Sequence, residues 1–98
     1  MSLPVRLRAL ARAEYDTAAD DYERRAAGLG ARFTAAVDAV LARIGDFPEM
    51  YAVLRRGVRA ARVRRYRYVV LYRVLADQVE VIGVIPARSN PATWQDRA

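Results

Sequence analysis

The chain has 98 residues, 54% of them hydrophobic, which suffices for one modest core and is too short for two. All 17 basic residues are arginine and 11 residues are acidic, so the net charge of +6 favours a polyanion or an acidic protein segment as a partner. Cysteine and histidine are both absent, which excludes disulfides, thiolate zinc sites and histidine as a general base or metal ligand.

The composition also bears on location and cofactors. The amino-terminal residues lack the apolar segment of a signal peptide, and no run approaches ~18 apolar residues. We therefore expect a single domain over residues 1–98, in the cytoplasm and without a membrane contact. Asp20 and Asp21 diverge by ~100° if they lie on a helix, so they predict a solvated face and no metal site. We expect no cofactor.

The first half of the chain predicts one short strand and two helices. Residues 5–7 are strand-like, and apolar residues recur at helical spacing over residues 10–27 and 29–44. Because glycine commonly ends a helix, Gly28 predicts an antiparallel helix hairpin. Acidic side chains of the first helix, including Glu23, are expected to face solvent. The second helix has an apolar stripe that predicts either core packing or a groove for a partner helix: Phe33, Val37, Val40 and Ile44.

The second half of the chain predicts strands. After an expected loop at residues 49–56, β-branched and aromatic residues indicate strands over 58–65, 66–75 and 79–86, with a hairpin turn at 76–78. The middle strand is apolar at alternate positions on both sides, so we expect it at the centre of the sheet. One face would carry the helix hairpin and the other would be half-open and basic. The order β-α-α-β-β-β predicts an α+β fold with the hairpin packed on a small, mainly antiparallel sheet.

Arginines cluster at the start of this β-rich region. The cluster comprises Arg59, Arg62, Arg64, Arg65 and Arg67. Codon usage in a GC-rich genome accounts for the absence of lysine, but it does not account for clustering. Arginines held on rigid β-structure can pair with carboxylates or phosphates of a partner. The alternative is a solvated strand edge whose charges discourage aggregation.

Several short motifs occur in an order that resembles the ParE/RelE toxin superfamily. The motifs are Ala-x-x-Glu-x-x-x-Ala-x-x-x-Tyr-Glu from Ala11, Gly-Leu-Gly-Ala-Arg-Phe from Gly28, Pro48, Val-Arg from Val58, Tyr-Val-Val-Leu-Tyr-Arg-Val from Tyr68, and Arg-Ser-Asn-Pro-x-x-Trp from Arg88. Members of this superfamily are toxins of bacterial toxin–antitoxin pairs, each neutralised by an antitoxin segment that wraps around it. The RelE branch cleaves messenger RNA in the ribosomal A site, and the ParE branch blocks DNA gyrase. The resemblance covers nearly the whole chain and implies one of these activities.

Three residues distinguish the two branches. Arg64, Arg88 and Trp94 stand where RelE-like nucleases have two arginines and a tyrosine. The arginines suit a phosphorane-like transition state, since fixed cations stabilise developing negative charge. Tryptophan can stack on a base, but its indole N–H is only a donor and cannot replace the proton chemistry of a phenol. The sequence therefore favours the ParE branch, acting by stoichiometric binding of gyrase. Pro86 and Asn90 depart from the histidine and aspartate of many relatives, and neither position has an assigned role.

These arguments predict a set of contact residues for the antitoxin or the target: Arg59, Arg62, Arg64, Arg65, Arg67, Arg88 and Trp94. For two of them a structural role is also open, because Arg88 can pair with Glu80 and Trp94 can pack over the sheet edge. Under the nuclease alternative, Arg64 and Arg88 are catalytic and the partners are the ribosome and messenger RNA. Two further alternatives are a degenerate toxin that only binds its antitoxin and a basic nucleic-acid-binding domain.

Overall fold

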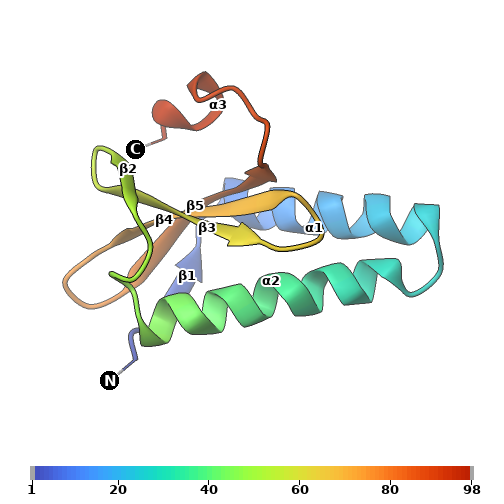
Figure 1. The fold of residues 1–98 in the computed structure, drawn as a ribbon, viewed down its shortest axis with the longest axis horizontal. Helices are drawn as coiled ribbons and strands as arrows, with labels where there is room; N and C mark the ends of the chain where they lie inside the picture. The colour runs from blue at the N-terminus through green and yellow to red at the C-terminus, as the bar shows by residue number, and fades with distance from the viewer. Residues whose placement is uncertain (1, 98) are drawn as a thin grey trace.

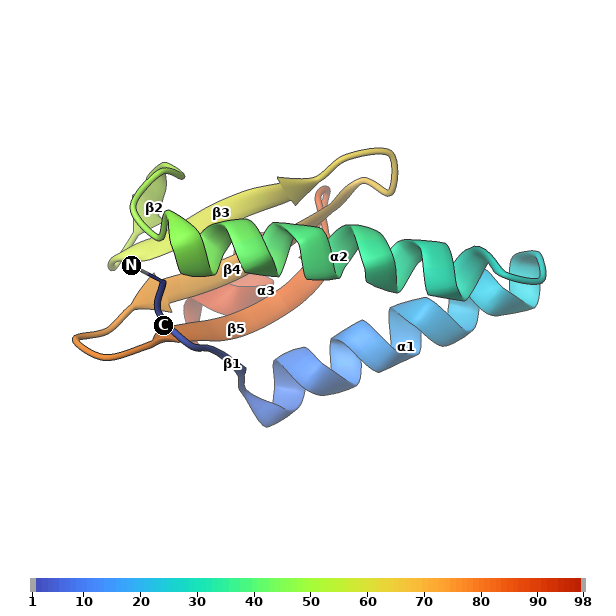
Figure 2. The same ribbon diagram turned by 90° about the horizontal axis from the view of Figure 1, so that it is seen from below.

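A computed structural model describes residues 2–97 of the chain. Its elements are, in order, β1 (Val5–Leu7), α1 (Ala9–Arg25), α2 (Leu29–Asp46), β2 (Val53–Arg55), β3 (Val58–Val63), β4 (Tyr68–Val74), β5 (Val79–Pro86) and α3 (Ala92–Gln95). The strands form one sheet in the order β1-β5-β4-β3-β2, with β1 parallel to β5 and all other neighbours antiparallel. The helices α1 and α2 lie side by side on one face, and α3 lies on the other (Figures 1 and 2). The predicted α+β fold is confirmed, with β4 at the centre of the sheet.

The helix hairpin is shaped by two glycines and one glutamate. Gly28 has φ 85°, which an L side chain rarely adopts. The backbone N–H groups of Gly28 and Gly30 donate to the Glu23 carboxylate at 2.9 and 3.0 Å, and these bonds, chiefly that from Gly28, lower the pKa of Glu23. A Cβ at Gly30 would lie 2.6 Å from the Ala19 carbonyl oxygen, so glycine permits the close approach of the helices. Glu23 is exposed as expected, but it also caps the start of α2.

The main core lies between the helix hairpin and the sheet. Phe33, Val37 and Ile44 of α2 are 0% exposed and pack against buried residues of the strands such as Val70 and Tyr72. The apolar stripe of α2 is therefore core at these three positions. Val40, the fourth member of the stripe, is only half-buried.

The other face of the sheet carries a second, smaller apolar cluster. Val58, Leu71, Ile82 and Ile85 are buried there together with Trp94, which is 7% exposed. The expectation of a half-open basic face is wrong. The strands place large apolar side chains on this face too, and the C-terminal segment with α3 covers them (Figure 1).

Three short segments differ from their predicted states. Residues 53–55 form β2 where a loop was expected, and residues 64–67 form a turn where strand was expected. The helix α3 follows β5, although no helix or strand was predicted after residue 86. β2 and α3 have three and four residues, too few to show a hydrophobic period. The tight turn into β3 is made by Arg56 and Gly57, both with positive φ, which is the geometry of a two-residue hairpin.

The β5 edge of the sheet is closed partly by β1 and partly by side chains. β1 pairs with β5 only at Val79, Glu80 and Val81. Beyond that point, the Val84 N–H donates to the Glu14 carboxylate at 3.1 Å, and Arg97 donates to the Ile82 carbonyl oxygen at 3.2 Å. Arg97 also forms two 3.0 Å hydrogen bonds with Glu14. This Glu14–Arg97 pair joins α1 to the C-terminal segment and satisfies backbone groups that a strand would otherwise pair.

Candidate partner-binding groove

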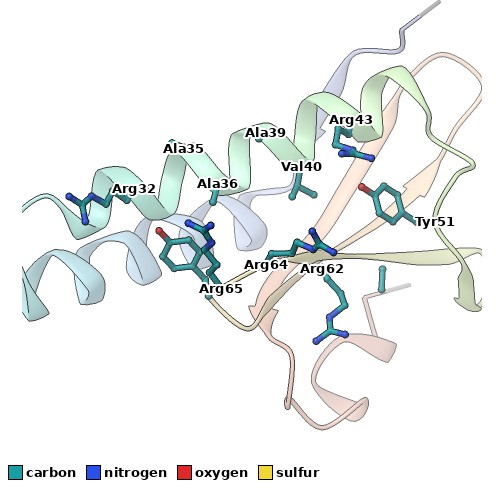
Figure 3. A pocket seen from close by; sticks show the side chains of 12 residues that line it. Arg32, Ala35, Ala36, Ala39, Val40, Arg43, Tyr51, Arg62, Arg64 and Arg65 are labelled. Carbon is teal, nitrogen blue, oxygen red and sulfur yellow. The ribbon is translucent and has the colours of Figure 1, made fainter.

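The opposite edge of the sheet is open. β2 pairs with β3 only at Val58 and Arg59. Within the described chain, residues 60–63 therefore have β4 on one side and no strand on the other. A groove with a volume of about 1210 Å³ lies along this edge, bounded by α2 and β3 (Figure 3).

The groove combines a small apolar floor with a high density of arginine. From α2 it takes residues three or four positions apart, and from the sheet side it takes residues of β3 and its flanking segments. The lining residues are Arg32, Ala35, Ala36, Ala39, Val40, Arg43, Tyr51, Ala60, Arg62, Arg64, Arg65 and Tyr66. Five of these are arginines and none is acidic. In Figure 3, Arg64 and Arg65 lie between strand and helix, whereas Arg62 points away from α2.

The groove arginines carry uncompensated charge. Arg62, Arg64 and Arg65 are exposed, and within residues 2–97 none of them has a carboxylate partner. Like charges that share a groove raise the local positive potential and attract an acidic ligand. The geometry of the groove thus favours an extended, acidic segment as its occupant.

Arg59, also predicted as a contact residue, has a structural role in the fold. Its guanidinium donates to the carbonyl oxygens of Glu49 and Tyr51 at 3.1 and 2.6 Å. The Tyr72 hydroxyl donates to the Pro48 carbonyl oxygen at 2.7 Å, and burial raises the pKa of Tyr72 to about 12. Together these bonds hold the segment that brings Tyr51 to the groove.

The remaining predicted contact residues lie outside the groove. Arg67 and Arg88 are exposed, and the Ala87 N–H donates to the Arg67 carbonyl oxygen at 2.7 Å, which places the start of the C-terminal segment beside the β3–β4 turn. Arg88 does not pair with Glu80, whose partners are Arg8 at 2.9 Å and Arg73 at 3.5 Å.

Trp94 is buried in the cluster on the face opposite α2, so the packing interpretation of this residue is favoured. The structure thus brings Arg62, Arg64 and Arg65 together at the groove. The buried side chain of Trp94 lies apart from these three arginines.

Among the charged and aromatic residues of the groove, sequence reasoning missed Arg32, Arg43, Tyr51 and Tyr66. For the two arginines a signal was present, because they stand eleven positions apart on α2 with alanines between them on the same side. That spacing puts both on one face of a helix, three turns apart. Tyr51 had no such signal, since the position of a loop residue depends on tertiary contacts.

The sequence matches the family model described as "ParE toxin of type II toxin-antitoxin system, parDE" over residues 5–91. The chain belongs to the ParE toxin family. Among solved structures, it is similar to one described as "Chromosomal ParDE TA system from P. aeruginosa", with a TM-score of 0.63 and 14% identity, covering 87% of this chain and 96% of that chain. This likeness shows the fold. A comparison with curated protein sequences finds no match. The predicted resemblance to the ParE branch is confirmed.

The described part of the chain lacks two other features. No helix there has both the length and the apolar character needed to cross a bilayer. Residues 2–97 also contain no group of three or more carboxylates positioned to hold a metal ion.

Proposed function

We propose that a cognate antitoxin neutralises this ParE-family toxin by placing an acidic segment in the groove between α2 and β3. We further propose that the free toxin binds and inhibits DNA gyrase stoichiometrically. The observation that carries the antitoxin proposal is the groove lining, which has five arginines and no carboxylate. A ParE toxin belongs to a ParDE toxin–antitoxin system, so an antitoxin is the partner that the family implies.

The shape of the groove suits a peptide. The open edge of β3 offers backbone donors and acceptors at residues 60–63, and an extended segment can pair with them as an added strand. The alanines of α2 leave room for apolar side chains of such a segment. Carboxylates on the segment would form charge-assisted hydrogen bonds with Arg64 and Arg65.

The gyrase proposal rests on membership of the ParE family, because fold alone does not specify a target. The placement of Trp94 gives no support to the alternative of a ribosome-dependent nuclease. In that alternative Trp94 would stack on a base, but its side chain is 7% exposed and packs against Leu71 and Ile82.

The first experiment tests toxicity and target together. The chain is induced in a bacterial host with and without the adjacent open reading frame, and DNA and protein synthesis are pulse-labelled separately. We expect growth arrest in which DNA synthesis fails first and which the neighbouring product relieves. Early failure of protein synthesis with cut messengers would favour the nuclease instead, and absence of arrest with retained antitoxin binding would indicate a degenerate toxin.

The second experiment tests the groove. The variant Arg64→Glu reverses one groove charge. It should weaken antitoxin binding on the order of tenfold or more, because a carboxylate of the bound antitoxin would then face the negative charge of the new glutamate. Arg6→Glu is the matched control, because Arg6 is exposed on β1, at the opposite edge of the sheet from the groove. Calorimetric titration with the antitoxin measures both variants. Equal losses in the two would contradict the groove as the binding site.

A further inference from the structure

The turn between β3 and β4, residues 64–67, is hereafter the arginine turn. Within residues 2–97, three non-glycine residues have positive φ, and all three are arginines in hairpin turns: Arg56 at 52°, Arg65 at 75° and Arg67 at 54°. This backbone region favours glycine, asparagine and aspartate and is disfavoured for a long side chain. Two such residues within one turn concentrate backbone strain at the two positions that carry the exposed charge.

The arginine turn is held rigidly at its centre. Tyr66, between the two arginines, packs its ring against Tyr22 and Phe33 with centroids 5.4 and 5.5 Å apart. The Tyr66 carbonyl oxygen accepts a 3.1 Å hydrogen bond from the Tyr22 hydroxyl. The Arg67 carbonyl oxygen accepts one of 2.7 Å from the backbone of the C-terminal segment. The central side chain is thus anchored in the protein, while Arg65 and Arg67 on either side are exposed.

The surroundings of the turn leave its positive charge uncompensated. Arg64 in the turn and Arg88 beside it are also exposed, and neither has a carboxylate partner within the described chain. Asp21 borders the pocket beside Tyr68 and Pro86, but it is already paired with Arg24. Four exposed guanidinium groups, each with planar donors suited to phosphate, are therefore available at one end of the sheet.

Arg64, Arg65 and Tyr66 of the arginine turn also line the groove, whose apolar floor comes from Ala35, Ala36, Ala39 and Val40 of α2. Beyond the groove, around Arg67 and Arg88, the surface has no such floor and no exposed large apolar side chain. The exposed large apolar residues of the described chain are Leu10, Phe47, Met50, Val53 and Leu54, none of them in residues 64–67 or 86–88. A protein interface needs an apolar or aromatic centre, whereas contacts to a nucleic-acid backbone need only charged and polar donors. We infer that the arginine turn contacts the phosphodiester backbone of a nucleic acid through Arg65 and Arg67. This inference goes beyond the proposed function in its ligand and in Arg67, although Arg65 also lines the groove assigned to the antitoxin.

The test measures binding of the purified protein to a fluorescein-labelled duplex DNA of about two helical turns and to a single-stranded RNA of the same length. Fluorescence anisotropy is recorded between about 50 and 200 mM salt, the range over which phosphate contacts weaken steeply. The variants are Arg65→Asn and Arg67→Asn, and the matched control is Arg56→Asn at the β2–β3 turn. Each removes one charge from a left-handed position that asparagine tolerates, so thermal unfolding should show that the fold is kept.

We expect Arg65→Asn and Arg67→Asn each to weaken binding about 5–10-fold near ~100 mM salt. Each should also reduce the slope of log affinity against log salt by about 0.9 for duplex DNA or about 0.7 for a single strand. Arg56→Asn should change affinity less than about twofold, because one distant charge contributes only through the screened field. Whichever of the two probes, duplex DNA or single-stranded RNA, binds with higher affinity is the nucleic acid whose backbone the turn contacts.

Three outcomes would overturn the inference. The first is that the wild-type protein binds neither nucleic acid at the lowest salt concentration. The second is that the control variant loses as much affinity as the two turn variants. The third is that polyglutamate and unlabelled nucleic acid of equal charge displace the labelled strand equally well. That result would assign the turn to an acidic protein. These measurements use no cells, so a failure of toxicity does not affect them.

Discussion

The two edges of the sheet contain the same kind of residue in opposite situations. At the β5 edge, Arg8, Arg73 and Arg97 each pair with a carboxylate, and side chains satisfy the backbone beyond β1. At the β3 edge, Arg62, Arg64 and Arg65 have no carboxylate partner in the described chain, and the backbone beyond β2 has no strand beside it. Exposed edges are usually blocked because they invite pairing with another chain. One edge is blocked here, and the other is left available for a partner.

The arginines can therefore be divided by role. An arginine whose guanidinium is already bound stabilises the fold, and its loss leaves a carboxylate or carbonyl without a partner. An arginine without such a bond contributes little to stability and is free to bind an external anion. Arg59 shows that this division cannot be made from clustering, since it belongs to the sequence cluster but bonds to backbone carbonyls.

The greatest loss of stability should come from releasing the segment that closes the β5 edge. Trp94→Ala should lower the free energy of unfolding by about 3–5 kcal/mol, because it empties the apolar cluster under α3. Chemical denaturation measures the loss, and Trp94→Phe is the control that keeps most of the apolar contact. A cost under about 1 kcal/mol for the alanine variant would show that the cluster does not hold the segment.

A smaller loss should follow from breaking the ion pair at that edge. The Arg97 and Glu14 side chains are 16% and 22% exposed, so Arg97→Ala should cost about 2–3 kcal/mol, less than for a fully buried pair. Arg62→Ala at the open edge should change stability by no more than about 0.5 kcal/mol. Denaturation of the two variants side by side compares the edges directly. Similar losses of unfolding free energy in the two variants would contradict the distinction between the closed and the open edge.

The effect of pH should be the weakest. The hydrogen bond from Arg8, aided by the charge of Arg73, lowers the pKa of Glu80 below 4.5. The folded state then binds this proton less readily than the unfolded state does. Glu80 therefore contributes stability above about pH 4.5 that is lost as the pH falls through its folded pKa. Thermal unfolding between about pH 7 and 3 should show a flatter decline for Glu80→Gln than for the wild type, and parallel curves would contradict this role.

Much of the fold could be predicted because its long elements have clear periodicity. Both long helices, the central position of β4 and the turn at residues 76–78 follow from side-chain spacing, and the structure agrees. β2 was missed because its geometry depends on an arginine in a turn position usually taken by asparagine, aspartate or glycine. In the candidate site, the arginines of β3 and of the turn after it were predicted because they cluster in the sequence. The arginines of α2 were not predicted, because they lie far from that cluster in the sequence.

Local sequence was enough to specify the α+β class, the helix hairpin, the ParE family resemblance and the excess of arginine. Those properties depend on the spacing and the composition of residues, which can be determined from the linear sequence alone. The separation of bound from free arginines came from the packed fold alone. The Glu14–Arg97 pair joins residues 83 positions apart, and the groove joins α2 to β3 across the chain reversal between them. Long-range pairing of this kind depends on how the elements pack, and no local pattern encodes it.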